Sequence, residues 1–307
     1  MTNLFDLLES RWLEAGRKAR SSHYPSDASA CLRDLYWRWA GMQASDPMDG
    51  TSWWRVNIGN AIHDLVQREL TAMVEAGAKP WPEFAFDSEV RSGQVVIDGS
   101  MRDGGITLRH PISARTDALF IDRDGAKAGA EIKTTYGAGV QKMKDRMPED
   151  RTLVQVLFYL ALFGAERYYI PIVSRDDANR VLFVVSRKDR ASCLAGYEVH
   201  RVMPTGDVAK AGEVPHERYV RALARLKDLE GYLERKELPE REFQVAIKNG
   251  EVRQKFQKNK VEYKSDWQCL YCSFKNKCWG ERAQSLIDGD NADEFAGRID
   301  ADELKEF

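Results

Sequence analysis

The sequence has no long apolar run, and none of its apolar stretches approaches the roughly 20 residues that a helix needs to cross a bilayer. It also lacks the G-x-x-x-x-G-K-[ST] phosphate loop, which excludes a nucleotide-driven motor of that class. Residues 1–20 carry acidic side chains and have the pattern of an amphipathic helix, not that of a secretory signal peptide. We therefore expect a protein with no membrane partner.

Cysteine is scarce, with five residues in a chain of 307. Without a secretory leader a reducing compartment is expected, and there clustered cysteines bind metal more often than they form disulfides. Three of them form the compact pattern Cys269-x2-Cys272-x5-Cys278. Three thiolates leave a tetrahedral site one ligand short, and Cys31 is the expected fourth ligand, with Cys193 as the competitor. Four thiolates fit either zinc or an iron–sulfur cluster.

Charge is nearly balanced, at −2 for the whole chain. This argues weakly against nucleic acid, but residues 281–307 hold nine acids and three bases, so the remainder carries +4. A local basic groove matters more than the total charge. Two runs, over 133–146 and 248–264, are candidates for such a groove, and a solvated charged surface remains the alternative for each.

The pattern of apolar residues predicts strands flanked by helices, and hence an α/β core with a mixed sheet. Residues 136–148 have the composition of a loop, and residues from 237 onward are polar and basic up to the cysteines. The expected helices cover 3–20, 27–42, 52–76, 149–164 and 215–236. The expected strands cover 84–90, 93–98, 112–122, 127–135, 167–173 and 180–186.

Two of these strands carry candidate metal ligands. Asp117 lies in the first, and Glu131 and Lys133 lie in the second, after the turn at 122–125. Residues two apart on a strand face the same side, so Glu131 and Lys133 are expected to share one site, and Asp117 on an antiparallel neighbour would lie nearby. Paired carboxylates bind Mg²⁺ or Mn²⁺, which activate water at a phosphodiester, and a lysine stabilises the developing charge. A strand pair with a surface salt bridge is the alternative.

Three further residues fit the same site. His63 lies in a predicted helix and is either a core residue or an imidazole ligand for the same ion. Gln155 and Tyr159 are four apart and would share a helix face just after the candidate site. An amide binds a phosphate or base and a tyrosine stacks on a base, so DNA binding is one interpretation and ordinary packing is the other.

Taken in order, His63, Asp117, Glu131-x-Lys133 and Gln155-x-x-x-Tyr159 resemble the RecB-like branch of the PD-(D/E)xK nuclease superfamily over residues 50–175. The resemblance implies that the His, the Asp, the Glu and the backbone carbonyl of Ile132 bind Mg²⁺ or Mn²⁺. It implies that Asp117, Glu131 and Lys133 are catalytic, and that the Gln and Tyr contact the DNA strand.

The cysteine spacing, with Cys31 before this core and Cys269, Cys272 and Cys278 after it, resembles the iron–sulfur exonucleases of the CRISPR-adaptation type and the AddB-type helicase-nucleases. That resemblance implies a [4Fe–4S] cluster. Without a phosphate loop, the helicase-fused form is excluded.

The expected fold is therefore an α/β, restriction-endonuclease-like mixed sheet flanked by helices, with a helical cap stapled by an iron–sulfur cluster on four cysteines. The expected parts are an N-terminal helical segment with the first cluster cysteine, the nuclease core, an iron–sulfur segment and an acidic tail, over 1–50, 51–236, 237–282 and 283–307. The expected function is a metal-dependent DNA exonuclease acting on single-stranded DNA or free ends, in the cytoplasm, or virus-encoded and acting in the host cytoplasm. The resemblance implies a role in recombination, repair or CRISPR or phage DNA processing. The alternatives are a non-catalytic nucleic-acid-binding module or a redox regulator, with a structural iron–sulfur or zinc site.

Overall fold

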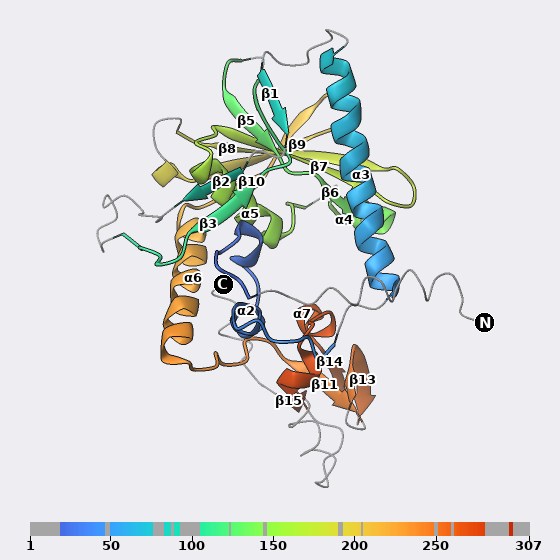
Figure 1. Cartoon of the computed structure of the whole chain (residues 1–307). Coiled ribbons are helices and arrows are strands. Elements are labelled where there is room, and N and C mark those ends of the chain that lie inside the picture. Colours follow the sequence, from blue (N-terminus) through green and yellow to red (C-terminus); the bar gives the residue numbers. More distant parts are fainter. Residues whose placement is uncertain are drawn as a thin grey trace, which may run out of the picture. The chain divides into compact units, whose positions relative to one another are not determined.

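A computed structural model of the chain describes residues 19–46, 50–75, 83–86, 89–92, 105–122, 124–143, 146–189, 193–203, 205–248, 251–258, 261–279 and 295–296. The chain divides into two units, whose elements are drawn in Figure 1. The sheet unit comprises residues 21–29 and 51–230. The cysteine unit comprises residues 1–20, 30–50 and 231–307.

An eight-stranded sheet forms the centre of the sheet unit. Its strands are β1 (Glu83–Phe86), β4 (Ala118–Ile121), β5 (Lys127–Ala130), β6 (Lys133–Thr135), β7 (Arg167–Ser174), β8 (Arg180–Arg187), β9 (Tyr197–Val202) and β10 (Val208–Val214). The order is β1-β4-β5-β7-β8-β9-β10, and β6 also pairs with β7. Because β5 and β6 run parallel to β7 while the other pairs are antiparallel, the predicted mixed sheet is confirmed.

Two helices, α5 (Asp150–Leu162) and α6 (Glu217–Arg235), pack on one face of this sheet. Side chains alternate along β7, so Tyr168 and Ile170 are fully buried in this core while Tyr169 belongs to the other face. Gly129 on β5 makes room for Tyr168, since an added Cβ would lie 2.3 Å from its ring. The predicted α/β class, with helices flanking the sheet, is thus confirmed (Figure 1).

A long helix, α3 (Gly50–Glu75), runs beside the sheet (Figure 1). It lies close to β6 at Gly59, where an added Cβ would be 3.0 Å from Thr134 Oγ1. The short helix η1 (Pro25–Asp27) packs against α5, and the strands β2 (Glu89–Ser92) and β3 (Ile112–Arg115) form a separate antiparallel pair.

Several predicted elements need correction. The expected strands over 112–122 and 127–135 are each broken in the middle, giving β3 and β4, and β5 and β6. The expected loop over 136–148 contains the helix α4 (Gly137–Met143). The predicted strand 93–98 lies wholly outside the described residues. So does the predicted helix 3–20, apart from residues 19–20, which are not helical.

The described part of the cysteine unit holds short helices and several short strands. The helices include α2 (Leu32–Trp39), α7 (Trp267–Leu270) and a helical turn over residues 275–279, and the strands are β11 (Val245–Lys248), β12 (Glu251–Arg253), β13 (Lys255–Lys258), β14 (Val261–Lys264) and β15 (Phe295–Ala296). β11 pairs with β12 and β15, and β13 pairs with β14. The region from 237 onward, expected only to be polar and basic, is therefore folded around a small core that includes Val245, Ile247 and Trp279. No helix among the described residues is long and apolar enough to cross a membrane.

Candidate active site

The strand breaks place the two predicted carboxylates together in the sheet unit. Asp117 lies in the bend between β3 and β4, and Glu131 lies between β5 and β6, so neither is on a strand as expected. β4 and β5 are antiparallel, with Ala118 opposite Ala130. The next residues outward are Asp117 and Glu131, which therefore emerge side by side at the end of this strand pair.

Asp117 is fixed from both its backbone and its side chain. Its Oδ2 accepts a hydrogen bond from the backbone N–H of Ile132 at 2.6 Å and lies 3.5 Å from His63 Nδ1. Its backbone carbonyl accepts from the Gln67 amide at 3.1 Å. His63 and Gln67 are four residues apart on α3, so one face of this helix holds the aspartate. Gln67 was not singled out from the sequence, although its helical spacing from His63 is visible there.

Glu131 and Lys133 also meet. Lys133 Nζ lies 2.7 Å from Glu131 Oε1, and that oxygen accepts from Gln155 Nε2 at 2.8 Å. Lys133 also donates to Gln155 Oε1 at 2.9 Å. Gln155 therefore bridges the carboxylate and the ammonium, which fixes the distance between them.

Tyr159 completes this network from within the core. Gln155 Nε2 lies 2.7 Å from the Tyr159 hydroxyl, which donates to the Arg115 carbonyl at 2.8 Å. Gln155 and Tyr159 are only 7% and 3% exposed. The structure thus places Gln155 against Glu131 and Tyr159 against the backbone of β3, and their contact with DNA stays a prediction.

A second buried tyrosine supports the bend that carries Asp117. The Tyr168 hydroxyl donates to Thr116 Oγ1 at 2.6 Å, and this threonine hydroxyl contacts the carbonyls of Ala118 and Ala130 at 3.1 Å. Neither Thr116 nor Tyr168 was singled out from the sequence, because an ordinary threonine beside a strand and a strand tyrosine carry no motif.

Burial controls the protonation of this site. It raises the pKa of Glu131 to about 7, against the opposing effect of the Lys133 ammonium. For His63, burial acts to lower the pKa, but the Asp117 carboxylate outweighs it and the pKa is raised. A buried carboxylate is costly to ionise, and a divalent cation offsets that cost. Two carboxylates, an imidazole and a lysine in one place fit a hard divalent ion and an anionic substrate.

The four predicted cysteine ligands all line one small cavity of the cysteine unit: Cys31, Cys269, Cys272 and Cys278. Cys31 immediately precedes α2, and the other three lie in and after α7. Burial raises the pKa values of Cys31 and Cys269 to about 12. Cys193, the competing ligand, belongs to the sheet unit, in the helix η2 (Cys193–Ala195).

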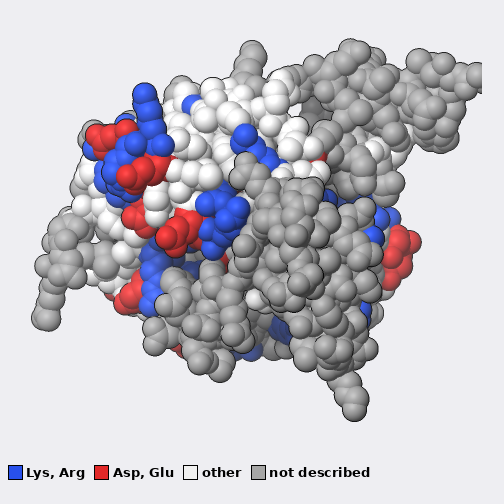
Figure 2. All heavy atoms as spheres, turned by 90° about the horizontal axis from the view of Figure 1, so that it is seen from below, with Lys and Arg blue, Asp and Glu red and all other residues white. Residues whose placement is uncertain are grey.

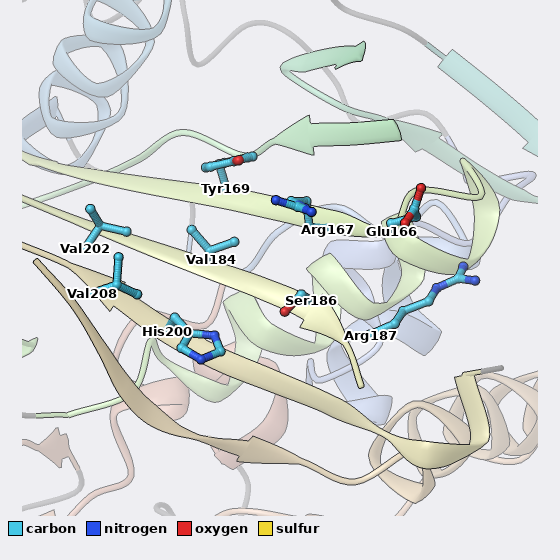
Figure 3. A pocket seen from close by; sticks show the side chains of 9 residues that line it. All are labelled: Glu166, Arg167, Tyr169, Val184, Ser186, Arg187, His200, Val202 and Val208. Atoms are coloured by element: carbon cyan, nitrogen blue, oxygen red, sulfur yellow. The ribbon is translucent and has the colours of Figure 1, made fainter. Parts of the chain in front are cut away.

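Two other features of the sheet unit stand apart from these sites. Figure 3 shows a pocket of about 460 Å³ on the sheet face opposite α5, lined by residues that include Tyr169, Val184 and His200. Its lining contains neither Asp117 nor Glu131. In the second feature, Glu230 accepts hydrogen bonds from the backbone N–H groups of Arg109 and His110 and contacts the His23 ring at 3.2 Å. We refer to Glu230 with these partners as the Glu230 pin.

Comparison with known proteins gives distant structural similarities. No protein-family model and no curated protein matches the sequence. The crystal structure of SSO0001 matches with a TM-score of 0.47 and 15% identity, over 90% of this chain and 96% of that one. An alkaline exonuclease from Laribacter hongkongensis, LHK-Exo, matches with a TM-score of 0.34 and 17% identity, over 74% of this chain and 97% of that one. Its complex with dAMP matches with a TM-score of 0.35 and 16% identity, over 74% and 95%. These similarities assign the chain to no family.

Proposed function

We propose that the chain is a divalent-metal-dependent deoxyribonuclease that hydrolyses phosphodiester bonds. The observation that supports this best is the convergence of His63, Asp117, Glu131 and Lys133 at one end of the β4–β5 pair. We further propose the restriction-endonuclease-like fold of the RecB-like branch, and an exonuclease acting on single strands or free ends.

His63, Asp117, Glu131 and the Ile132 carbonyl would hold Mg²⁺ or Mn²⁺, which when bound supplies a Lewis acid and a more acidic water. The chain's own residues then do three things. The Ile132 N–H fixes one Asp117 oxygen. Lys133 carries a positive charge to the place where negative charge builds on the phosphate. Gln155 holds Lys133 and Glu131 at a fixed separation.

The test compares end-labelled single and double strands with Mn²⁺, with Mg²⁺ and with a chelator. The wild-type protein should degrade DNA only with metal. Glu131→Gln and Asp117→Asn should lower the rate about 100-fold or more by weakening the metal site. Lys133→Met should lower it about 10²- to 10³-fold through lost charge stabilisation. Glu213→Gln, at an exposed carboxylate on β10, is the matched control. Degradation by Glu131→Gln at the wild-type rate would refute the proposed site.

We also propose that Cys31, Cys269, Cys272 and Cys278 hold a [4Fe–4S] cluster. Their common cavity supports this, and so does their spacing. Four thiolates around one small cavity fit either zinc or an iron–sulfur cluster. The spacing of the cysteines along the sequence is our reason for proposing the cluster.

Chemical analysis of anaerobically purified protein tests this assignment. Iron and acid-labile sulfide should be present in equal amounts. Cys31→Ser should lose most of both, while Cys193→Ser should retain them. Stoichiometric zinc without iron would overturn the assignment and leave the nuclease proposal untouched.

A further inference from the structure

A cluster of two arginines and one tyrosine lies beyond the carboxyl ends of two parallel strands. β6 and β7 are parallel, with Thr135 opposite Ser174, so the residues that follow them, Tyr136 and Arg175, emerge together. The backbone N–H of Arg175 donates to the Thr135 carbonyl at 2.8 Å. Ligands of sheets containing parallel strands bind at such carboxyl edges.

Both guanidinium groups face one ring. The Arg175 Cζ lies 4.5 Å and the Arg55 Cζ 5.9 Å from the Tyr136 ring centroid, within the range of cation–π attraction. Arg175 Nη1 also donates to the Arg55 backbone carbonyl at 2.7 Å, which links the cluster to α3. The Tyr136 side chain is 43% exposed, so the cluster is open to solvent.

The two positive charges have no carboxylate partner among the described residues. The neighbouring acids, in the turn after β7, accept other hydrogen bonds. Asp176 accepts from the Gly137 N–H at 2.7 Å, and Asp177 accepts from the Asn179 side chain at 2.7 Å. A phosphate bound by these guanidinium groups would supply the negative charge that the neighbouring acids do not provide. Planar guanidinium donors match the oxygens of a phosphate.

A local cluster matters here because the charge on the described part of the face in Figure 2 is mixed. In Figure 2, blue Lys and Arg atoms lie beside red Asp and Glu atoms over the described part of the face shown. The whole chain also carries a net charge of −2, so a general positive charge does not attract DNA, and a pair of arginines is a more specific attractor for a phosphate.

The position of the cluster relative to the candidate active site follows from two independent elements. Tyr136 is three residues beyond Lys133, or about 10 Å along an extended chain. Arg55 is eight residues before His63 on α3, or about 12 Å along a helix. A stacked strand rises about 3.4 Å per nucleotide, so either distance corresponds to about three nucleotides.

We propose that Arg55, Tyr136 and Arg175 bind a phosphodiester of the single-stranded DNA substrate about three nucleotides from the scissile bond. This inference rests on the nuclease function proposed above. The arginines bind the phosphate, and the exposed part of the Tyr136 ring contacts the adjoining sugar or base.

The first test compares two substrates. A labelled oligothymidylate of ten nucleotides is long enough to reach Arg55, Tyr136 and Arg175 from the candidate active site. Thymidine 5′-(4-nitrophenyl phosphate) is too short to do so. For Arg55→Gln, Arg175→Gln and Tyr136→Ala, the ratio of kcat/KM on the long substrate to that on the short one should fall about 10- to 100-fold. Arg221→Gln, at an exposed arginine of α6, is the matched control and should keep the wild-type ratio. An equal fall on both substrates would overturn the inference, because it would indicate damage to the fold or to the active site.

The second test measures binding of the same oligothymidylate with Ca²⁺ in place of Mn²⁺, over a range of salt concentrations. The double variant Arg55→Gln/Arg175→Gln should reduce the slope of log Kd against log salt by about 0.7, the value for one phosphate contact on a single strand, and each single variant by less. A wild-type slope in the double variant would refute the strand contact while the nuclease proposal stands. A wild-type protein that neither binds nor cleaves DNA would instead refute the nuclease proposal, and this inference with it.

Discussion

At the scale of single residues, Gln155 could either contact the DNA strand or orient the proposed metal ligand Glu131. If Gln155 only contacted DNA, removing its side chain would leave the metal affinity intact. The structure shows it donating to Glu131 Oε1, and partners that orient a ligand usually change metal affinity about 10- to 100-fold. We expect Gln155→Leu to weaken Mn²⁺ binding by that factor in calorimetry. Gln141→Leu, at an exposed glutamine of α4, is the control, and unchanged affinity in Gln155→Leu would return the residue to a purely DNA-contacting role.

The hydroxyl of Tyr159 gives a matched prediction. Tyr159→Phe removes the donor to the Arg115 carbonyl and the partner of Gln155 without changing the packing of the ring. An unsatisfied buried carbonyl costs about 1–3 kcal/mol, so urea unfolding should show a loss of that size. Cleavage should fall as well, because Gln155 loses one of its anchors. A variant with wild-type stability would mean that the hydroxyl is replaced there by water.

The pKa of Glu131 makes metal binding depend on pH. With a pKa of about 7, raised by burial, Glu131 is mostly protonated at pH 6, and the pKa of His63 is raised as well. Both must lose their protons to bind a cation, so binding should release between about one and two protons at pH 6 and far fewer at pH 8.5. Calorimetry in two buffers of different ionisation enthalpy measures this number. Release that does not change with pH would contradict the assignment of these ligands.

The main charged residues of the candidate site could be found in the sequence, because Asp117, Glu131 and Lys133 are chemically unusual beside apolar strands. The hydrogen bonds that surround these residues could not be predicted. The burial of Tyr159 depends on packing against β3, 44 residues before it, and against Tyr168 on the next strand, and the periodicity of the helix carries no information about either contact.

At the scale of elements, the Glu230 pin joins three segments of the sheet unit: residues 21–29, the chain before β3, and α6. Burial acts to raise the pKa of Glu230, but the N–H groups of Arg109 and His110 and the ring of His23 outweigh it and lower the pKa to about 2. The free carboxyl titrates near pH 4.3 in an unfolded chain. The stability that these contacts provide is therefore fully present above about pH 4.3 and is lost as the pH falls towards 2.

Glu230→Gln should accordingly cost about 1–3 kcal/mol at pH 7, where a neutral amide replaces a charged acceptor. It should also flatten the decline of stability between about pH 4.3 and 2. Urea unfolding at several pH values measures both effects. Glu198→Gln, at a carboxylate on β9, is the control, and an unchanged acid slope in Glu230→Gln would show that other groups set it.

The strands β7 and β8 were predictable because they are apolar and alternate in burial. The breaks in the strands at Asp117 and Glu131 were not predictable, because strand-forming residues continue on both sides of each break. The sequence therefore gives no signal at the residue where strand pairing stops. β9 does alternate, as YEVHRV, and was overlooked. β10 has mostly exposed side chains and a register shift near Gly212, so it offers little apolar pattern.

At the scale of the whole molecule, a cluster bound by Cys31 and Cys278 would close a loop covering most of the chain. Closing a very long loop removes about 4–5 kcal/mol of unfolded-state entropy, by analogy with disulfides. Protein stripped of iron under anaerobic conditions should therefore unfold at lower urea concentration than the intact protein. The same treatment of Cys31→Ser should produce no further change, and an equal shift there would point to a cause other than the cluster.

The interleaving of the two units was not visible in the sequence. Residues 21–29 belong to the sheet unit although their neighbours on both sides do not. The reason lies in long-range contacts: the His23 N–H donates to the Pro111 carbonyl, and the Ser113 N–H donates to the His23 carbonyl. Such pairings between distant segments leave no local periodic signal.

This interleaving has a consequence for the order of events during synthesis. The chain passes between the two units four times, and Cys31 precedes Cys269 by 238 residues. At about 5–20 residues per second, the ribosome makes Cys31 about 12 to 50 seconds before its first partner. A single thiol cannot hold a cluster, so the proposed cluster would assemble only after Cys269, Cys272 and Cys278 have been made. A chain terminated before Cys269 would carry the complete set of candidate catalytic residues without the proposed cluster site.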